Sequence, residues 1–435
     1  MELYEDLVAR GLIHQITDPK AGEYLNQKKL TVYSGIDPTS DSLHVGHLLG
    51  LVTLRRLQKA GHKIIALVGG ATGAIGDPSG KTQERQLLTP EQIDRNVEGI
   101  SLIISRFLDL RSSSTLLLNN LDWFKDLSIV EFLRDVGKHF TVNYMIAKDS
   151  VQSRLQDREH GLSFTEFTYM IFQAYDFYYL NQKYDCTLQV GGADQWGNIT
   201  AGIELIRRKA ALQKGGAEPV FAITWPLVTK ADGTKFGKTE SGTIWLSSDK
   251  TKIYDFYQFF LRTQDKEVIQ FLNYFTFLPL EEIQRLQKTV EVSPEKREAQ
   301  NVLAREMTVL VHGEEEYQKV QKASSSLFTV DFSQIDAESL EELVKNAPST
   351  TKPRNLLDAG ISIVDLLVEV KLVSSKGQAR NDIQGGGIYL NNQRVDDVAF
   401  KVGADSLVAG RYMILRKGKK NYHTIIYSGP GFTSN

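Results

Sequence analysis

An alternation of strand-like and helix-like segments near the N-terminus constrains the fold more than any other feature. The segment KKLTVYSGID (28–37) is typical of a strand that ends in a turn, and LHVGHLLGLVTLRRLQKAG (43–61) has apolar residues at helical spacing. HKIIALVGG (62–70) is again an apolar run of strand length. A strand, a helix and a strand in succession predict a βαβ unit, and therefore an α/β fold with a parallel sheet covered by helices.

The same patterns divide the chain into domains. STLLLNN (114–120) and CTLQVGG (186–192) are two more strand-like runs, whereas the sequence from residue 253 onward is helical until clusters of Ser, Thr and Pro interrupt it. A hairpin signal follows at Asn391-Asn392. We predict a Rossmann-like nucleotide-binding domain, a helical domain, a linker and a small α+β module, at residues 1–225, 226–322, 323–353 and 354–435.

Composition narrows the class of protein. The chain has 435 residues, with 51 basic and 53 acidic side chains, so its net charge does not indicate a nucleic-acid partner; from residue 351 onward, however, 12 basic residues face 7 acidic ones. One cysteine, Cys186, excludes a disulfide framework and a multi-cysteine zinc site. The N-terminus lacks a signal-peptide pattern, and no apolar run approaches the ~18 residues of a membrane span. We therefore expect a cytoplasmic protein without a membrane partner.

A glycine-rich turn follows the apolar strand at 64–68. In GGATGAIGDPSGKT only three residues lie between Gly76 and Gly80, one fewer than a P-loop requires, and no G-x-G-x-x-G fingerprint is present. A plain turn containing a proline is one interpretation. Asp77, Lys81 and Arg85 in or beside the turn favour a functional role instead.

Two histidines, His44 and His47, lie three residues apart after a cluster of turn residues. A metal site would need further ligands, which the neighbouring sequence does not offer. One buried and one solvated helix histidine is a second interpretation. In the third, Asp41 or Ser42 caps the helix, so that both histidines lie on one face of its first turns, where free N–H groups attract phosphate.

Two further segments carry candidate functional residues. TKADGTKFGKTESG (229–242) places Lys235 and Lys238 in a glycine-containing loop suited to polyphosphate, although plain solvent surface is the commoner origin of such loops. In TEFTYMIFQAYDFYYL (165–180), Tyr169, Gln173 and Asp176 share one helix face. Burying Asp176 without a donor would be costly, so we expect it to bind a ligand rather than pack passively.

Taken together, these segments resemble the class I aminoacyl-tRNA synthetases. HVGH and KFGKT are similar to the HIGH and KMSKS signatures of that family, with Val45, Phe236, Gly237 and Thr239 as variants. YSGIDPTSDSLHVGH, LVGGATGAIGDPSGK, SFTEFTYMIFQAYDF and QVGGADQWGNI resemble the bacterial-type tyrosyl-tRNA synthetases. The tail resembles their C-terminal RNA-binding module of the ribosomal-protein type.

The resemblance implies a two-step reaction. Tyrosine and ATP give tyrosyl-adenylate and pyrophosphate, and tyrosine then passes to the 3′ end of its tRNA. Magnesium is expected only as the counter-ion of ATP, without a structural metal. The implied catalytic residues are Thr39, His44, His47, Lys81, Arg85, Lys235 and Lys238. The implied tyrosine-binding residues are Tyr33, Asp77, Tyr169, Gln173, Asp176, Gln189 and Gln195. The implied ATP- or adenylate-binding residues are Gly35, Asp37, His47, Gly192, Asp194 and Lys238.

The RNA side depends on the basic tail and on the resemblance. A solvated charged face is the alternative to RNA binding there. The predicted RNA-binding residues are Lys371, Lys376, Arg380, Arg394, Arg416, Lys417, Lys419 and Lys420.

The resemblance also implies a homodimer with residues 132–145 at its interface. Competing functions are a tryptophanyl enzyme, which Tyr33 and Asp176 disfavour, a P-loop ATPase or kinase, and an RNA-binding homologue without catalysis.

Overall fold

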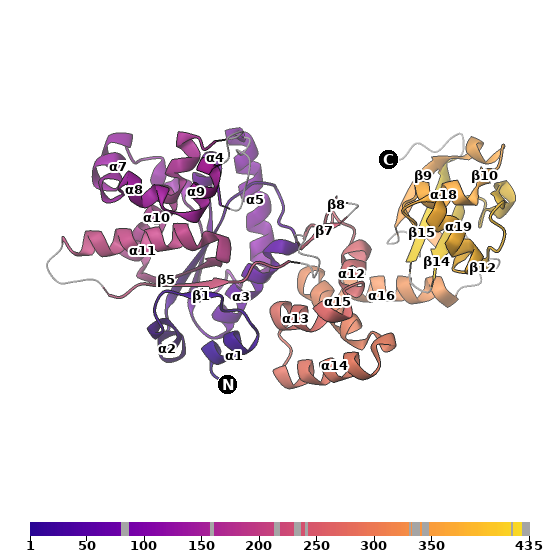
Figure 1. Cartoon of the computed structure of the whole chain (residues 1–435), viewed down its shortest axis with the longest axis horizontal. Helices are drawn as coiled ribbons and strands as arrows, with labels where there is room; N and C mark the ends of the chain where they lie inside the picture. The colour runs from indigo at the N-terminus through magenta and orange to yellow at the C-terminus, as the bar shows by residue number, and fades with distance from the viewer. Residues whose placement is uncertain are drawn as a thin grey trace. The chain divides into compact units, whose positions relative to one another are not determined.

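The chain forms two compact units (Figure 1). One contains Met1–Lys250 and Thr263–Leu303, and the other contains Thr251–Arg262 and Ala304–Asn435. The computed structural model describes residues 1–79, 87–156, 161–212, 218–229, 236–239, 242–329, 332, 340–341, 348–418 and 421–428. Within these ranges, no helix is both long and apolar enough to span a membrane.

The first unit is built on a six-stranded sheet with the strand order β1-β6-β5-β2-β3-β4. Five strands are mutually parallel, and β1 joins the edge in the antiparallel sense. The predicted α/β fold with a parallel sheet is confirmed. The strands β1 to β6 span Gln15–Ile16, Thr31–Ile36, Lys63–Val68, Thr115–Asn119, Cys186–Gly192 and Phe221–Trp225.

Helices cover both faces of this sheet. In Figure 1, α10 and α11 lie on one side of the strands and α3 and α5 on the other. Helix α10 begins where Ser163 Oγ accepts a hydrogen bond from Glu166 N at 3.2 Å, and it ends at Asp185, which is left-handed with φ 52°. The helices α1 to α11 span Leu3–Ala9, Lys20–Gln27, Leu48–Lys59, Thr72–Ile75, Pro90–Phe107, Leu121–Phe124, Ile129–Asp135, Val142–Ile146, Asp149–Gln156, Phe164–Tyr184 and Trp196–Ala210.

The predicted helical domain is divided between the two units. Helices α13 (Asp265–Phe275) and α14 (Leu280–Val292) belong to the first unit, whereas α12 (Ile253–Leu261) and α16 (Glu314–Thr329) belong to the second. Helix α15 (Glu298–His312) runs from one into the other. The prediction of helices with little strand structure between them is confirmed for this part of the chain.

The second unit also holds a small α+β module, as predicted. Its main sheet has the order β12-β11-β14-β15-β9. The predicted hairpin joins β11 to β12 through Asn391 and Asn392, whose φ values of 50° and 64° are those of a type I′ turn. The elements β9, β10, α18, α19, β11, β12, β13, β14 and β15 span Ser349–Pro353, Ile361–Ser362, Ile363–Glu369, Lys376–Gln384, Ile388–Leu390, Gln393–Arg394, Lys401–Val402, Tyr412–Lys417 and Asn421–Ser428.

The predicted linker at 323–353 extends too far in both directions. Helix α16 continues to Thr329, and β9 (Ser349–Pro353) is an edge strand of the module sheet. This strand pairs in parallel with β15, with Thr350 opposite Ile425. Its Ser, Thr and Pro residues are turn formers by local preference, but an edge position tolerates them because only one side needs hydrogen-bond partners.

Candidate active site

A buried carboxylate lies near the middle of α10. Asp176 is 2% exposed, and its two oxygens accept hydrogen bonds from Trp123 Nε1 at 3.0 Å and from Asn120 Nδ2 at 3.1 Å. Burial raises the pKa of Asp176 well above its ordinary value, and the two hydrogen bonds oppose that shift. Both oxygens are held by these donors, so a ligand O–H or N–H that reaches the ionised carboxylate meets an oriented acceptor.

Tyr33 and Gln189 face each other from neighbouring strands. They are register partners of β2 and β5, and Gln189 Nε2 donates a hydrogen bond to Tyr33 Oη at 3.1 Å. Burial, and then the charge of Asp176, raises the pKa of Tyr33 well above its ordinary value. Within the part of the chain that the structure describes, the buried Oε1 of Gln189 has no hydrogen-bond partner. An unpaired buried carbonyl costs about 1–3 kcal/mol, which a bound donor would recover.

A continuous series of hydrogen bonds connects Asp176 with Tyr169. Tyr169 Oη and Thr72 Oγ1 each donate to the carboxylate of Asp37 at 2.7 Å. Asn120 Nδ2 donates to Thr72 Oγ1 at 3.0 Å and also to Asp176. We call the series Tyr169, Asp37, Thr72, Asn120 and Asp176 the polar chain. It brings one predicted adenylate residue and two predicted tyrosine residues into one network.

The glycine-rich turn makes room for the polar chain. A Cβ on Gly69 would lie 2.2 Å from Asp37 Oδ1 and 2.2 Å from Thr72 Oγ1. Any side chain at residue 69 would therefore break the contact between Asp37 and Thr72. Gln173, the remaining predicted residue of the α10 face, is partly buried one turn after Tyr169.

Asp77 lies in the same turn, beyond α4. It is 6% exposed, and its carboxylate accepts hydrogen bonds from Ser79 N at 2.9 Å, Gln195 Nε2 at 2.7 Å and Asn198 Nδ2 at 3.3 Å. Gln195 ends the short 3₁₀ helix η3 (Ala193–Gln195) that follows β5. Two predicted tyrosine-binding residues far apart in sequence, Asp77 and Gln195, are therefore in direct contact.

The two histidines start α3 differently from the prediction. Val45–His47 form a 3₁₀ turn, η1, and the cap is His44 rather than Asp41 or Ser42. His44 Nδ1 accepts from Gly46 N at 3.1 Å, and His47 Nδ1 accepts from His44 N at 3.2 Å. At the cap position, a histidine ring nitrogen accepts the backbone N–H that a Ser, Thr, Asp or Asn side chain usually accepts.

This capping fixes the chemistry of both rings. Because each Nδ1 accepts a hydrogen bond, the neutral tautomer carries its proton on Nε2. Burial, followed by the neighbouring ring of His44, lowers the pKa of His47 to about 3, so His47 is neutral at physiological pH. The rings lie 4.1 Å apart. No group of three or more His, Cys, Asp or Glu side chains in the described residues is arranged to hold a metal ion.

The histidine segment lies against the first half of the KFGKT segment, nearly two hundred residues away in sequence. A Cβ on Gly237 would lie 2.5 Å from Val45 Cγ2, and Val45 N and Gly237 O both hydrogen-bond to the backbone of Ile244 at 3.0 Å. Phe236 is buried against Phe271, with ring centroids 4.8 Å apart. The variant residues Phe236 and Gly237 therefore anchor this segment beside the histidines.

Several predicted residues lie beyond what the structure describes. Lys81, Arg85 and Lys235 fall outside the described ranges, and Lys238 is described only as the first backbone position of β7 (Lys238–Thr239), which pairs with β8 (Gly242–Thr243). Four other predicted residues lie at the carboxyl ends of β2 and β5, where parallel sheets bind ligands. Gly35, Thr39 and Asp194 are exposed there, and Gly192 is partly exposed.

Comparison with known proteins identifies the family. The family model described as "tRNA synthetases class I (W and Y)" matches residues 25–329, and that described as "Tyrosine--tRNA ligase SYY-like C-terminal domain" matches residues 339–425. A tyrosine–tRNA ligase of Bacillus velezensis is 51% identical over 428 residues, which cover 98% of this chain and 99% of the relative. The chain belongs to the tyrosyl-tRNA synthetase family. The predicted family is thereby confirmed.

Two further tyrosyl-tRNA synthetases are similar over much of the chain. The tyrosine–tRNA ligase of Geobacillus stearothermophilus is 50% identical over 431 residues, covering 98% of this chain and 100% of the relative. The crystal structure of a C-terminally truncated mitochondrial tyrosyl-tRNA synthetase of Aspergillus nidulans superposes with a TM-score of 0.67 at 32% identity. The match covers 75% of this chain and 94% of that one.

In this member of the tyrosyl-tRNA synthetase family, several predicted RNA-binding residues of the tail already contact other side chains of the module. Arg416 lies 3.5 Å from the ring centroid of Tyr389, while Lys371 and Arg380 are exposed. Lys419 and Lys420 fall outside the described residues. Three others form ion pairs within the module: Lys376 with Asp365 at 2.7 Å, Arg394 with Asp396 at 2.6 Å and Lys417 with Asp382 at 2.7 Å.

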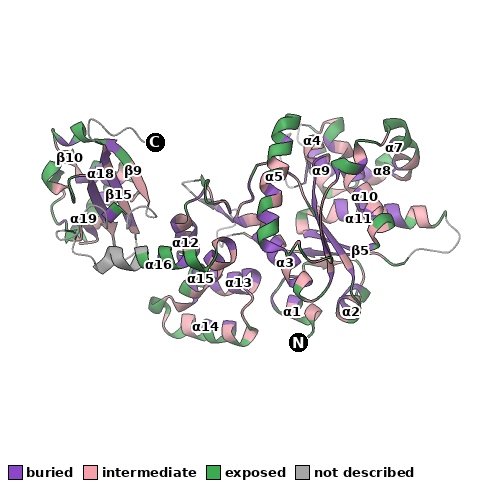
Figure 2. Cartoon of the chain, turned by 180° about the vertical axis from the view of Figure 1, so that it is seen from behind, coloured by how far each residue is buried: buried purple, intermediate pink, exposed green. Residues whose placement is uncertain are grey.

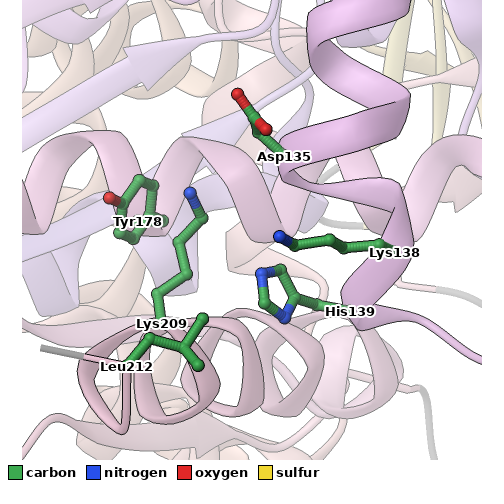
Figure 3. A pocket seen from close by; sticks show the side chains of 6 residues that line it. All are labelled: Asp135, Lys138, His139, Tyr178, Lys209 and Leu212. Atoms are coloured by element: carbon green, nitrogen blue, oxygen red, sulfur yellow. The ribbon is translucent and has the colours of Figure 1, made fainter.

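Two cavities lie away from the candidate site. One of about 180 Å³ lies between α7, α10 and α11, where the Lys209 ammonium lies 4.5 Å from the ring centroid of Tyr178 (Figure 3). The other, of about 610 Å³, lies at the ends of α3 and α5, where Arg55 donates to the carbonyl of Phe107 at 3.0 Å. Basic side chains commonly satisfy helix C-termini in this way. Neither cavity is lined by a predicted site residue.

Sequence reasoning missed several members of the site. Thr72, Asn120, Trp123 and Asn198 contact predicted residues but were not predicted themselves. The positions of Asn120 and Trp123 in the sequence could have indicated their role. Both follow the end of β4 within four residues, and the carboxyl ends of parallel strands meet at one edge of a sheet.

Proposed function

We propose that this chain activates L-tyrosine with ATP, forming tyrosyl-adenylate and pyrophosphate, and then transfers tyrosine to the 3′ end of tyrosine tRNA. The observation that carries the substrate assignment is the carboxylate of Asp176, which is buried and held by Trp123 and Asn120. Such an acceptor matches a phenol and leaves a phenylalanine ring without a partner for the carboxylate. The similar proteins named tyrosine–tRNA ligase support the same assignment.

The tyrosine pocket has a phenol end and an ammonium end. At the phenol end, Asp176 accepts the hydroxyl proton, and Tyr33 shares that hydroxyl. Gln189 lies beside them, with an oxygen that has no partner within the described residues. At the ammonium end, the proposed contacts are Asp77, Tyr169 and Gln173, with Gln195 along the tyrosyl moiety. The proximity of these residues in the structure supports this division.

On the nucleotide side, the enzyme aligns the reactants and stabilises charge. The tyrosine carboxylate attacks the α-phosphate and no side chain becomes covalent, so most of the catalysis comes from positioning and electrostatics. His44 and His47 donate from Nε2 to ATP, and the remaining proposed phosphate ligands are Thr39, Lys81, Arg85, Lys235 and Lys238. Magnesium enters with ATP as part of the substrate. The proposed ribose and adenosine contacts are Gly35, Asp37, Gly192 and Asp194.

ATP–pyrophosphate exchange measured with each amino acid in turn tests this function. We expect exchange with tyrosine only, at a rate well above the background without amino acid. Exchange supported by tryptophan would show that the tryptophanyl alternative is correct. Absence of exchange with any amino acid, together with intact tRNA binding, would indicate a non-catalytic RNA-binding protein.

The C-terminal module is proposed to hold the tRNA. Deleting residues 348–435, which removes all of β9 rather than cutting it, should abolish tRNA charging and leave pyrophosphate exchange within about twofold, because the module contributes phosphate contacts and no reacting group. Charging assays on the truncated and full-length chains make the comparison. Reversing the charge of Lys371 and Arg380, which are exposed, should weaken tRNA binding and reduce its salt dependence. Retained charging after the deletion would refute the role of the module.

A homodimer is proposed on the basis of an apolar surface. Helices α7, α8, α9 and α10 share one core cluster, and α7 presents a largely exposed outer face (Figure 2). Several exposed apolar side chains on neighbouring helices are typical of an interaction surface. The predicted segment 132–145 runs through it. The exposed large apolar residues of these helices are Ile129, Val130, Leu133, Val142, Leu155 and Phe164.

Sedimentation of charge variants tests the dimer. Phe164, which is 77% exposed, becomes part of a desolvated surface in a dimer, so Phe164→Lys should convert the dimer to a monomer at micromolar concentration. Val292→Lys on α14 is the matched control, since Val292 is 81% exposed and lies outside this surface. A wild-type chain that sediments as a monomer while fully active would contradict the proposal.

A cytoplasmic location is proposed because the single cysteine, Cys186, is buried and unpaired, as is usual in a reducing environment.

A further inference from the structure

A buried asparagine lies behind the proposed ammonium site. Asn198 is in the first turn of α11 and is 2% exposed. Its Nδ2 lies 3.3 Å from Asp77 Oδ1, 3.3 Å from Ser79 Oγ and 3.2 Å from Gln195 Oε1. All three neighbours are oxygens, so only the NH₂ end of the amide can face them. One side chain thus donates to the Asp77 turn and to the turn after β5.

These contacts place hydrogen-bond donors on both carboxylate oxygens of Asp77. Oδ1 accepts from Ser79 N as well as from Asn198, and Oδ2 accepts from Gln195 Nε2. The amide of Gln195 is itself oriented, because its Nε2 faces Asp77 and its Oε1 faces Asn198. Donors on both oxygens fix the rotation of the carboxylate, and a carboxylate whose rotation is fixed presents its remaining lone pairs in a constant direction.

Helix capping does not explain the position of Asn198. The first residue of α11 is Trp196, and its cap position, Gln195, makes no side-chain capping hydrogen bond. Asn198 instead reaches out of the helix to a different segment of the chain. Burial, followed by the charges of Asp37 and Asp77, raises the pKa of the Tyr169 phenol, so Asp77 lies near Tyr169.

We propose that Asn198 is a positioning residue for the α-ammonium group of tyrosine, acting through the Asp77 carboxylate. This inference rests on the proposed function. Asn198 makes no contact with the substrate. It holds the Asp77 turn against the start of α11, so that the carboxylate meets the ammonium group without rotating. Loss of Asn198 therefore weakens recognition of the ammonium group and leaves recognition of the phenol and of ATP unchanged.

Binding of three ligands separates this role from a general structural one. Tyrosine carries phenol, ammonium and carboxylate; tyramine lacks the carboxylate; 3-(4-hydroxyphenyl)propionate lacks the ammonium group. Asn198→Ala should weaken tyrosine and tyramine by the same factor, ~10-fold for a hydrogen bond to a charged group, and change the propionate less than twofold. In pyrophosphate exchange the KM for tyrosine should rise, with kcat and the KM for ATP unchanged.

A double-mutant cycle with Asp77→Asn tests the route of the effect. If Asn198 acts through Asp77, adding Asn198→Ala in the Asp77→Asn background should weaken tyramine binding no further. Equal losses for all three ligands, or additive losses in the cycle, would overturn the inference.

Asn273→Ala on α13 controls for loss of a half-buried amide. Asn198→Ser, which keeps a shorter donor, serves if the alanine variant does not fold. A wild-type chain that binds neither tyrosine nor tyramine would refute the proposed function instead.

Discussion

Replacing Asp176 by alanine is expected to lower kcat/KM for tyrosine by ~10²-fold and to remove most of the preference for tyrosine over phenylalanine. The change deletes the charged acceptor of the phenol and leaves Trp123 Nε1 and Asn120 Nδ2 without it, and hydrogen bonds to a charged group contribute about 1.5–3 kcal/mol. Pyrophosphate exchange with tyrosine and with phenylalanine gives both quantities. The KM for ATP should change little, because the polar chain reaches the nucleotide side only through Asp37.

Asp255→Ala is the control for this variant. Asp255 lies on α12 in the other unit, and burial raises its pKa as it does for Asp176. Removing it should affect stability and leave the ratio of tyrosine to phenylalanine turnover as in the wild type. If Asp176→Ala retained that ratio, the assignment of Asp176 to the phenol would be wrong.

His44→Asn is expected to reduce kcat for adenylate formation by ~10²–10³-fold with the KM for tyrosine nearly unchanged, as removal of one transition-state donor typically does. Asparagine is a preferred helix cap, so its Oδ1 can replace Nδ1 as acceptor of the Gly46 N–H, but it has no counterpart of the Nε2 proton. Single-turnover measurement of adenylate formation isolates this step.

His62→Asn is the matched control. His62 is fully buried, and its Nδ1 likewise accepts a backbone N–H, from Leu30 at 3.2 Å, but it lies outside the candidate site. This change should lower the thermal unfolding temperature and leave the rate of adenylate formation intact. An equal loss of rate in the two variants would mean that the histidines act through stability rather than as donors to ATP.

Four strands of the sheet could be predicted because their own sequences have a strand-like pattern. Strands β2, β3, β4 and β5 all lie within predicted strand-like runs. Of these, β2, β3 and β5 are central parallel strands, which are buried on both faces, whereas β4 is an edge strand. β1 is only two residues long and is defined by its pairing with β6. β9 consists of turn-forming residues and is a strand because β15, more than seventy residues later, offers an edge. Long-range pairing of this kind leaves no local pattern.

The candidate site likewise has residues that could be predicted from the sequence and residues that could not. The side chains proposed to touch the ligand lie in long sequence motifs, and the resemblance predicts them. Their supporting partners could not be predicted, because Asn120, Thr72 and Asn198 come from other segments and contribute single hydrogen bonds. The cap at His44 was predicted at the wrong residue, since the pattern of polar residues at 40–42 satisfies the usual rule and only the geometry shows a ring nitrogen in that role.

The polar chain has a consequence for the dimensions of the substrate. It joins the phenol end of the pocket to Tyr169 at the ammonium end through side chains carried by the ends of β2 and β4 and by α4 and α10, so regular backbone structure sets the separation between the two ends. With the roles proposed above, the pocket gauges the length of an amino acid as well as its chemistry. We therefore expect homotyrosine, longer by one methylene, and meta-tyrosine, with its hydroxyl displaced around the ring, to bind more weakly than tyrosine, although each carries every group that tyrosine has.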